Sequence, residues 1–180
     1  MRISLILVLA GIILQCIDIP VDIEFMTINL GSDIVAYILI IIGLSKFLKS
    51  ENLQFRKCFK YAIAGLIAES ISRILTAVDF KDSTVTVNML LLGLTTYIFL
   101  KFVYNFTETI VFESRFLKTE LPKNNLKGAI SIFSVIIVAY YVVLAFYSGF
   151  NMYANILLLI CALYYSAEMY NVINILYSEK

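Results

Sequence analysis

Four charged residues of this sequence lie inside long apolar segments. They are Glu69, Arg73, Lys101 and Glu168. At the centre of a membrane-spanning helix each charge would cost on the order of 2.5–3.5 kcal/mol, so such residues usually face a bundle interior or a cavity. A carboxylate there can bind a cation or exchange a proton, and a cationic side chain can bind an anion. We therefore treat these residues as candidates for a polar intramembrane site.

Helical spacing groups Glu69 and Arg73 with small and polar neighbours. The two residues are four apart and share one helix face. Gly65 and Ser72 lie on the same face, and Ala68 lies beside it. A stripe of this kind suits close packing of helices in a membrane. We therefore expect the segment around residue 69 to form the central helix, with its charged face turned inward.

Two further segments each place an aromatic hydroxyl, a charge and an amide on one helix face. The first combines Tyr97, Lys101 and Asn105, and the second combines Tyr164, Glu168 and Asn171. Their charges are opposite in sign, and the four intramembrane charges together sum to zero, so mutual pairing could neutralise them. The candidate ligand-binding residues are Glu69, Arg73, Lys101, Glu168, Tyr97, Tyr164 and Asn171.

Three interpretations of these charges stay open. They can form a structural ion network that fixes which helix faces which. They can form a polar site for a substrate, an ion or a proton, with Glu69 or Glu168 as the titrating carboxylate. They can also contact a partner helix. Lys101 has a further alternative, because it lies near a helix end and its amine can extend to the membrane surface.

The composition defines the elements that must position these residues. Of the 180 residues, 61% are hydrophobic, whereas soluble domains average about 45–50%. A spanning helix needs about 20 mostly apolar residues. We predict a single all-α domain over residues 1–180, a polytopic transmembrane bundle of about six spans in three hairpins. The spans are 3–19, 32–48, 59–78, 85–106, 126–147 and 152–177.

Two segments need a separate interpretation. The first span resembles a signal peptide, but we expect it to be retained as a helix, because the small residues of a cleavage site are missing and Gln15 precedes Cys16. The stretch Thr107–Leu121 is too polar to span. We expect it to continue the preceding helix into the cytoplasm, either as a solvated face or as a docking surface for a partner.

The basic residues predict the orientation. Of the fourteen Lys and Arg residues, all except Arg73, Lys81 and Lys101 fall on one side of the predicted bundle. They are Arg2, Lys46, Lys49, Arg56, Lys57, Lys60, Arg115, Lys118, Lys123, Lys127 and Lys180. Short loops rich in Lys and Arg stay in the cytoplasm. We therefore expect a multi-pass protein of the cell membrane with both termini cytoplasmic.

Several functional classes lack their motifs. Histidine is absent, and no HExxH, GxSxG or Walker sequence occurs, so we expect no enzyme and no cofactor. The three cysteines show no metal-ligand spacing.

The outer segment Asp18–Asp33 carries four acids. It is either an ordinary loop or an acidic vestibule with a weak divalent-cation site. A net charge of +1 argues against nucleic acid. The expected partners are the lipid bilayer and either another membrane subunit or a second copy.

One stretch resembles a known group. Residues 28–47 contain Asp33, Tyr37, Gly43 and Leu44 in the pattern D-x-x-G-Y-I-L-x-x-x-G-L, with Ala36 in place of the first glycine. This resembles uncharacterised small polytopic membrane proteins of low-GC Gram-positive bacteria, over about the first third of the chain. The resemblance implies no activity. In size and span number alone, the chain is also similar to substrate-binding subunits of energy-coupling-factor vitamin transporters, a fold-level analogy.

These observations support two hypotheses of function. The first is a small transport or ligand-binding subunit with a polar site between the third, fourth and sixth spans. The second is a non-catalytic accessory, immunity or scaffold protein that binds a larger membrane complex. The first rests on the four intramembrane charges, and the second rests on the missing catalytic motifs and the polar extension of the fourth span.

Overall fold

Six helices make up almost all of the structure, a computed structural model that describes residues 2–17, 20–23, 26–29, 33–48, 53–77, 84–116, 123–146 and 151–177. The helices are α1 (Arg2–Gln15), α2 (Asp33–Ser45), α3 (Leu53–Ala77), α4 (Thr84–Phe116), α5 (Lys123–Phe146) and α6 (Asn151–Tyr177). Two short strands, β1 (Pro20–Ile23) and β2 (Met26–Asn29), lie between α1 and α2. The predicted helix bundle is confirmed.

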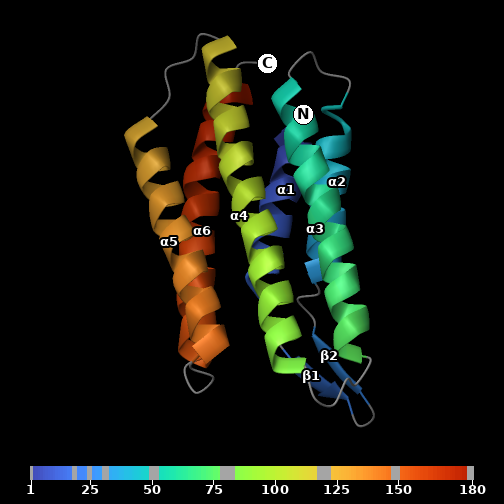
Figure 1. Cartoon of the computed structure of the whole chain (residues 1–180). Helices are drawn as coiled ribbons and strands as arrows, with labels where there is room; N and C mark the ends of the chain where they lie inside the picture. The colour runs from blue at the N-terminus through green and yellow to red at the C-terminus, as the bar shows by residue number, and fades with distance from the viewer. Residues whose placement is uncertain are drawn as a thin grey trace.

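The helices form a ring of three hairpins. Consecutive pairs α1–α2, α3–α4 and α5–α6 pack together, α2 contacts α3, α4 contacts α5, and α6 closes the ring by contacting α1. Figure 1 shows the six helices side by side with alternating direction. The Arg2 guanidinium donates a hydrogen bond to the Tyr170 hydroxyl at 3.1 Å, so α1 begins beside the end of α6. We call this end of the bundle the basic end, and the end that carries β1 and β2 the hairpin end.

The outer surface of the bundle is apolar. Met89–Ser114, Asn125–Val143 and Met152–Tyr177 are long and apolar enough to cross a membrane, and α1 and α2 are shorter apolar helices. Large side chains such as Leu90, Val135 and Ile160 are exposed on these helices. Contiguous apolar surface of this kind is typical of contact with lipid or another protein. The three long apolar helices thus suggest a membrane location.

Two glycines allow α1 and α2 to pack at very short range. A Cβ atom on Gly43 would lie 2.5 Å from the Ser4 carbonyl oxygen, and one on Gly11 would lie 2.7 Å from the Ala36 carbonyl oxygen. Backbone atoms cannot move aside, so only glycine fits at either position. Gly43 and the buried Ala36 belong to the pattern on which the bacterial resemblance rests. In this structure these two pattern positions therefore serve the contact between α1 and α2.

The strand pair is a feature that the predicted spans do not contain. The strands are antiparallel, with Pro20 opposite Asn29 and Ile23 opposite Met26. Pro20 is the first residue of its strand, a position where its missing N–H is tolerated. The first span was expected to reach residue 19, but α1 ends at Gln15, and the Cys16 N–H donates to the Ile13 carbonyl in a tightened last turn. α1 is therefore a short helix.

The continuation of the fourth span is confirmed, because α4 is one helix of 33 residues through Phe116. Its polar side chains are partly used inside the bundle. The Thr107 hydroxyl donates to the Val103 carbonyl, so the Tyr165 hydroxyl, 2.8 Å away, donates to Thr107. The Thr109 hydroxyl donates to the Asn105 carbonyl in the same way. Thr107 thus contacts α6, Thr109 contacts Cys58 of α3 at 3.2 Å, and both threonines are buried.

Candidate functional site

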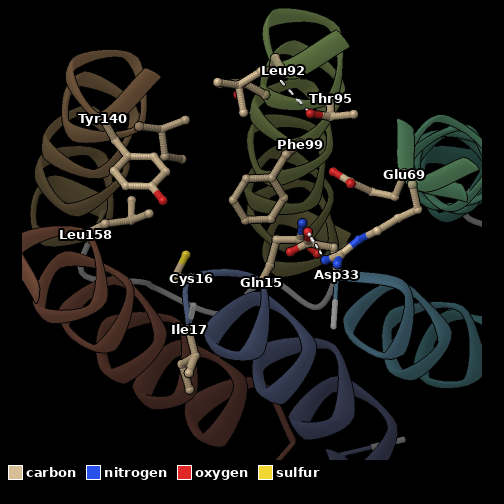
Figure 2. Close-up of a pocket in the computed structure, with 13 residues that line it drawn as sticks. Gln15, Cys16, Ile17, Asp33, Glu69, Leu92, Thr95, Phe99, Tyr140 and Leu158 are labelled. Carbon is tan, nitrogen blue, oxygen red and sulfur yellow. Dashed lines mark hydrogen bonds and ion pairs between the residues drawn. The ribbon is translucent and has the colours of Figure 1, made fainter. Parts of the chain in front are cut away.

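A polar cavity of about 190 Å³ lies where the six helices meet near the hairpin end. Every helix contributes to its wall. The lining residues are Gln15, Cys16, Ile17, Asp33, Glu69, Arg73, Leu92, Thr95, Thr96, Phe99, Ile137, Tyr140 and Leu158. Figure 2 shows side chains from α1 to α6 converging on this space. Because the ring closes around it, the cavity is a property of the whole bundle.

The lengths of the helices explain why the cavity forms there. α1 and α2 have 14 and 13 residues, about 20 Å at 1.5 Å per residue, whereas α4 is about 50 Å long. The two short helices therefore accompany the others for only part of their length. The cavity begins at the level of Gln15, the last residue of α1, and Asp33, the first residue of α2. This level is roughly 20 Å from the basic end at 1.5 Å per residue.

Arg73 forms an ion pair with Asp33 across the cavity wall. Its Nη2 atom lies 3.3 Å from Asp33 Oδ2, and the two side chains are 41% and 28% exposed. Asp33 is the first residue of α2, where a carboxylate also interacts favourably with the helix dipole. Glu69 shares the face of Arg73 and lines the same cavity. The guanidinium therefore connects α3 to α2.

Glu69 is the more buried acid, with only 8% of its surface exposed. Figure 2 shows its carboxylate directed from α3 toward Thr95 and Phe99 on α4. The Thr95 hydroxyl donates to the Leu92 carbonyl at 3.1 Å. The described lining thus holds two carboxylates and one guanidinium. If all three are ionised, the cavity carries a net charge of −1.

Two polar atoms in this region have no hydrogen-bond partner among the residues that the structure describes. They are Gln15 Oε1, on the cavity wall, and the hydroxyl of Tyr37. Tyr37 is fully buried, and its ring lies against Gly65, one turn before Glu69. Buried polar groups normally have partners. The side of the cavity formed by α1, α2 and α3 is therefore rich in polar groups whose hydrogen-bonding capacity is incompletely used.

Lys101 and Tyr97 lie on a different face of α4 from the cavity. Tyr97 is 58% exposed, Lys101 is exposed, and the ammonium lies 5.6 Å from the centroid of the Tyr97 ring. Thr95 and Phe99, which line the cavity, are each two residues away and so point in the opposite direction on a helix. The structure therefore does not bring Lys101 and Tyr97 to Glu69.

The stripe on α6 also lies away from the cavity. Tyr164 is 45% exposed, Asn171 is exposed and Glu168 is half-buried; none of the three is part of the described lining, to which α6 contributes Leu158. Among the described residues, no ion pair joins Glu168 to Lys101. Of the seven candidate residues, the structure thus brings Glu69 and Arg73 together at a cavity and leaves the other five outside it.

An apolar groove adjoins the polar cavity. It has a volume of about 250 Å³ and lies between α5 and α6. Its lining residues are Ile136, Ala139, Tyr140, Val143, Tyr153, Ala154 and Leu157. Tyr140 lines both spaces. This tyrosine therefore stands between the polar interior and the apolar groove.

The acidic segment Asp18–Asp33 cannot be followed as a unit, because the side chains of Asp18, Asp22 and Glu24 lie outside the described residues. Within the described part of the chain, no group of three His, Cys, Asp or Glu side chains is placed to hold a metal ion.

Comparison of the chain with protein-family models, with curated proteins and with solved structures finds no match. The cavity itself is thus the basis for any functional proposal.

Proposed function

We propose that this chain is a small multi-pass membrane protein that binds a small ligand in the cavity, as a transport or ligand-binding subunit. The observation that carries the proposal is the position of Glu69, an acid that is 8% exposed and faces a cavity lined by all six helices. Intramembrane ionisable residues that face a cavity commonly mark pathways for substrates, ions or protons.

The composition of the wall supports the same function. Binding sites for small molecules combine an apolar and aromatic lining with a few convergent polar groups. Here Phe99, Ile137 and Leu158 supply the apolar part, and Glu69 with Thr95 supplies polar groups. The Asp33–Arg73 ion pair connects two helices at the cavity's edge. Such an arrangement can hold a ligand and respond to it by a change in helix packing.

The proposal includes six spans in the cell membrane, with both termini in the cytoplasm. The alternating directions of the six helices place the beginning of α1 and the end of α6 together. The described basic residues Arg2, Lys46, Arg56 and Lys127 are at or near helix termini of that same end. Under the positive-inside rule this end is cytoplasmic, so the cavity lies nearer the outer surface.

Thiol labelling tests whether the cavity is a water-accessible site. The three native cysteines are replaced, and a single cysteine is introduced as Thr96→Cys, on the cavity wall. The matched control is Thr107→Cys on the same helix, where the side chain is buried against Tyr165. We expect membrane-impermeant methanethiosulfonates added to intact cells to modify the first variant much faster than the second. Equal, negligible rates at both positions would contradict a ligand site open to the outer side.

A second candidate is an accessory or scaffold subunit of a larger membrane complex. The observation in its favour is the C-terminal part of α4, where Glu108 and Phe112 are both exposed and lie one turn apart. An exposed aromatic ring next to a charge suits a protein contact. Purification in mild detergent tests this candidate, since it requires a stoichiometric partner. Replacement of Phe112 by Ser should release that partner without changing labelling at Thr96→Cys.

A further inference from the structure

Among the described residues that line the cavity, the negative charges outnumber the positive ones. Asp33 is paired with Arg73 at 3.3 Å, whereas Lys101 lies on the outer face of α4. No other described residue of the lining carries a charge besides Glu69. Arg73 also acts electrostatically on Glu69, but one guanidinium cannot neutralise two carboxylates, and a buried negative charge that is left over is costly because it loses its hydration. Either a proton or a bound cation can remove that cost.

The remainder of the lining distinguishes an organic cation from a metal ion. Ca²⁺ and Mg²⁺ need about six or more oxygen ligands, and the described residues contain no cluster of acids that could hold a metal ion. Beside Glu69 the wall instead presents the ring of Phe99 and, from α5, the ring of Tyr140. Figure 2 shows both rings extending toward the same space. Aromatic rings attract ammonium groups through their negative faces.

The volume limits the size of the ligand. The cavity measures about 190 Å³. Pockets for drug-sized molecules measure roughly 300–1,000 Å³, whereas a cavity of about 150 Å³ accommodates benzene. The apolar groove of about 250 Å³ begins on the other side of Tyr140. A compact cation with one small apolar substituent therefore fits, and the substituent can lie against Tyr140.

We infer that the ligand of this cavity is a small organic monocation, an amine or a quaternary ammonium, whose charge lies beside Glu69 and whose apolar part contacts Phe99 and Tyr140. This inference rests on the proposed function, because it requires the cavity to be a ligand site. It assigns Glu69 the role of counter-charge to the ligand. It assigns Arg73 the role of neutralising Asp33, so that the cavity accepts one positive charge and not two.

Calorimetry with three probes of similar size tests the inference on the purified full chain in detergent. The probes are benzylammonium, benzyl alcohol and benzoate. We expect the wild-type protein to bind the cation at least tenfold more tightly than the alcohol and to bind benzoate most weakly. This comparison needs no variant. If the alcohol binds as tightly as the cation, Glu69 is neutralised by a proton and the inference is wrong.

Two variants assign the preference to a residue. Glu69→Gln should reduce the affinity for benzylammonium to that for benzyl alcohol and leave the alcohol unchanged, whereas Glu168→Gln, outside the cavity, should change neither. A tenfold preference that survives Glu69→Gln would overturn the assignment. If Thr96→Cys is labelled but no cation binds, the cation inference fails and the proposed function stands. If Thr96→Cys is also unreactive, the proposed function fails with it.

Discussion

Arg73 on α3 reaches Asp33 on α2 with 3.3 Å between Nη2 and Oδ2. This contact connects the second helix hairpin to the first at the level where the short helix α2 begins. It also distinguishes the two charges of α3 that line the cavity, because Arg73 pairs with Asp33 and Glu69 is the more buried of the two.

The coupling between Asp33 and Arg73 can be measured with a double-mutant cycle. The variants are Asp33→Asn, Arg73→Gln and both together, and the measurement is the free energy of unfolding in detergent. The side chains are 28% and 41% exposed, which weakens the attraction, so we expect a coupling energy of about 0.5–1 kcal/mol. The cycle isolates the pair from the other contacts of each residue. If the effects of Asp33→Asn and Arg73→Gln on the free energy of unfolding are additive, the two side chains do not interact directly. The control cycle combines Asp33→Asn with Lys101→Gln, and its effects should be additive.

The contact of Gly65 with Tyr37 predicts an unusually costly alanine substitution. A Cβ atom at Gly65 would overlap the ring of Tyr37, which is fully buried. We expect Gly65→Ala to reduce the free energy of unfolding by about 1–3 kcal/mol through overpacking. The matched control is Gly128→Ala, where nothing lies within 4 Å, and there alanine should raise helix stability by up to about 1 kcal/mol.

A second substitution distinguishes this clash from a general effect of helix propensity. In a Tyr37→Leu background the ring that obstructs the new methyl group is absent. Gly65→Ala should then cost much less than in the wild-type chain. An equal cost in both backgrounds would show that Tyr37 does not determine the need for glycine at this position.

Two adjacent tyrosines of α6 should differ in their contribution to stability. Tyr165 is fully buried and donates a hydrogen bond to Thr107 at 2.8 Å, whereas Tyr164 is 45% exposed. Loss of one hydrogen bond that leaves a buried acceptor costs about 1 kcal/mol. We therefore expect Tyr165→Phe to lower the free energy of unfolding by about that amount and Tyr164→Phe to leave it nearly unchanged. The reverse order would contradict the packing of α6 described above.

Sequence periodicity predicted the helices and the shared face of Glu69 and Arg73, because both depend only on local spacing. It could not predict the partner of Arg73. Asp33 lies 40 residues earlier, beyond the reach of spacing within one helix. The strand pair was also missed, since Val21, Ile23 and Ile28 extend the apolar character of the neighbouring segments.

The inner face of α4 was the other feature that spacing could not determine. The polar groups of Tyr97 and Lys101 led to the prediction that their face is the inner one, but apolar residues occur on all sides of this helix, so hydrophobicity does not separate that face from the face of Thr95 and Phe99. Packing against α5 and α6 selects the second, because Phe99 contacts Phe133 edge to face with 6.3 Å between ring centroids. Contacts of this kind join residues that are far apart in the sequence, and the spacing of residues along one sequence does not indicate which of them meet.

The central claim is that Glu69 makes the cavity selective for a positive charge. The most direct measurement compares the labelling rates of Thr96→Cys with a cationic and an anionic methanethiosulfonate, each normalised to its rate with a free thiol in solution. We expect the cationic reagent to react several-fold faster when Glu69 is present and the two normalised rates to become equal in Glu69→Gln. A charge preference that is absent, or that is unchanged by Glu69→Gln, would contradict the account.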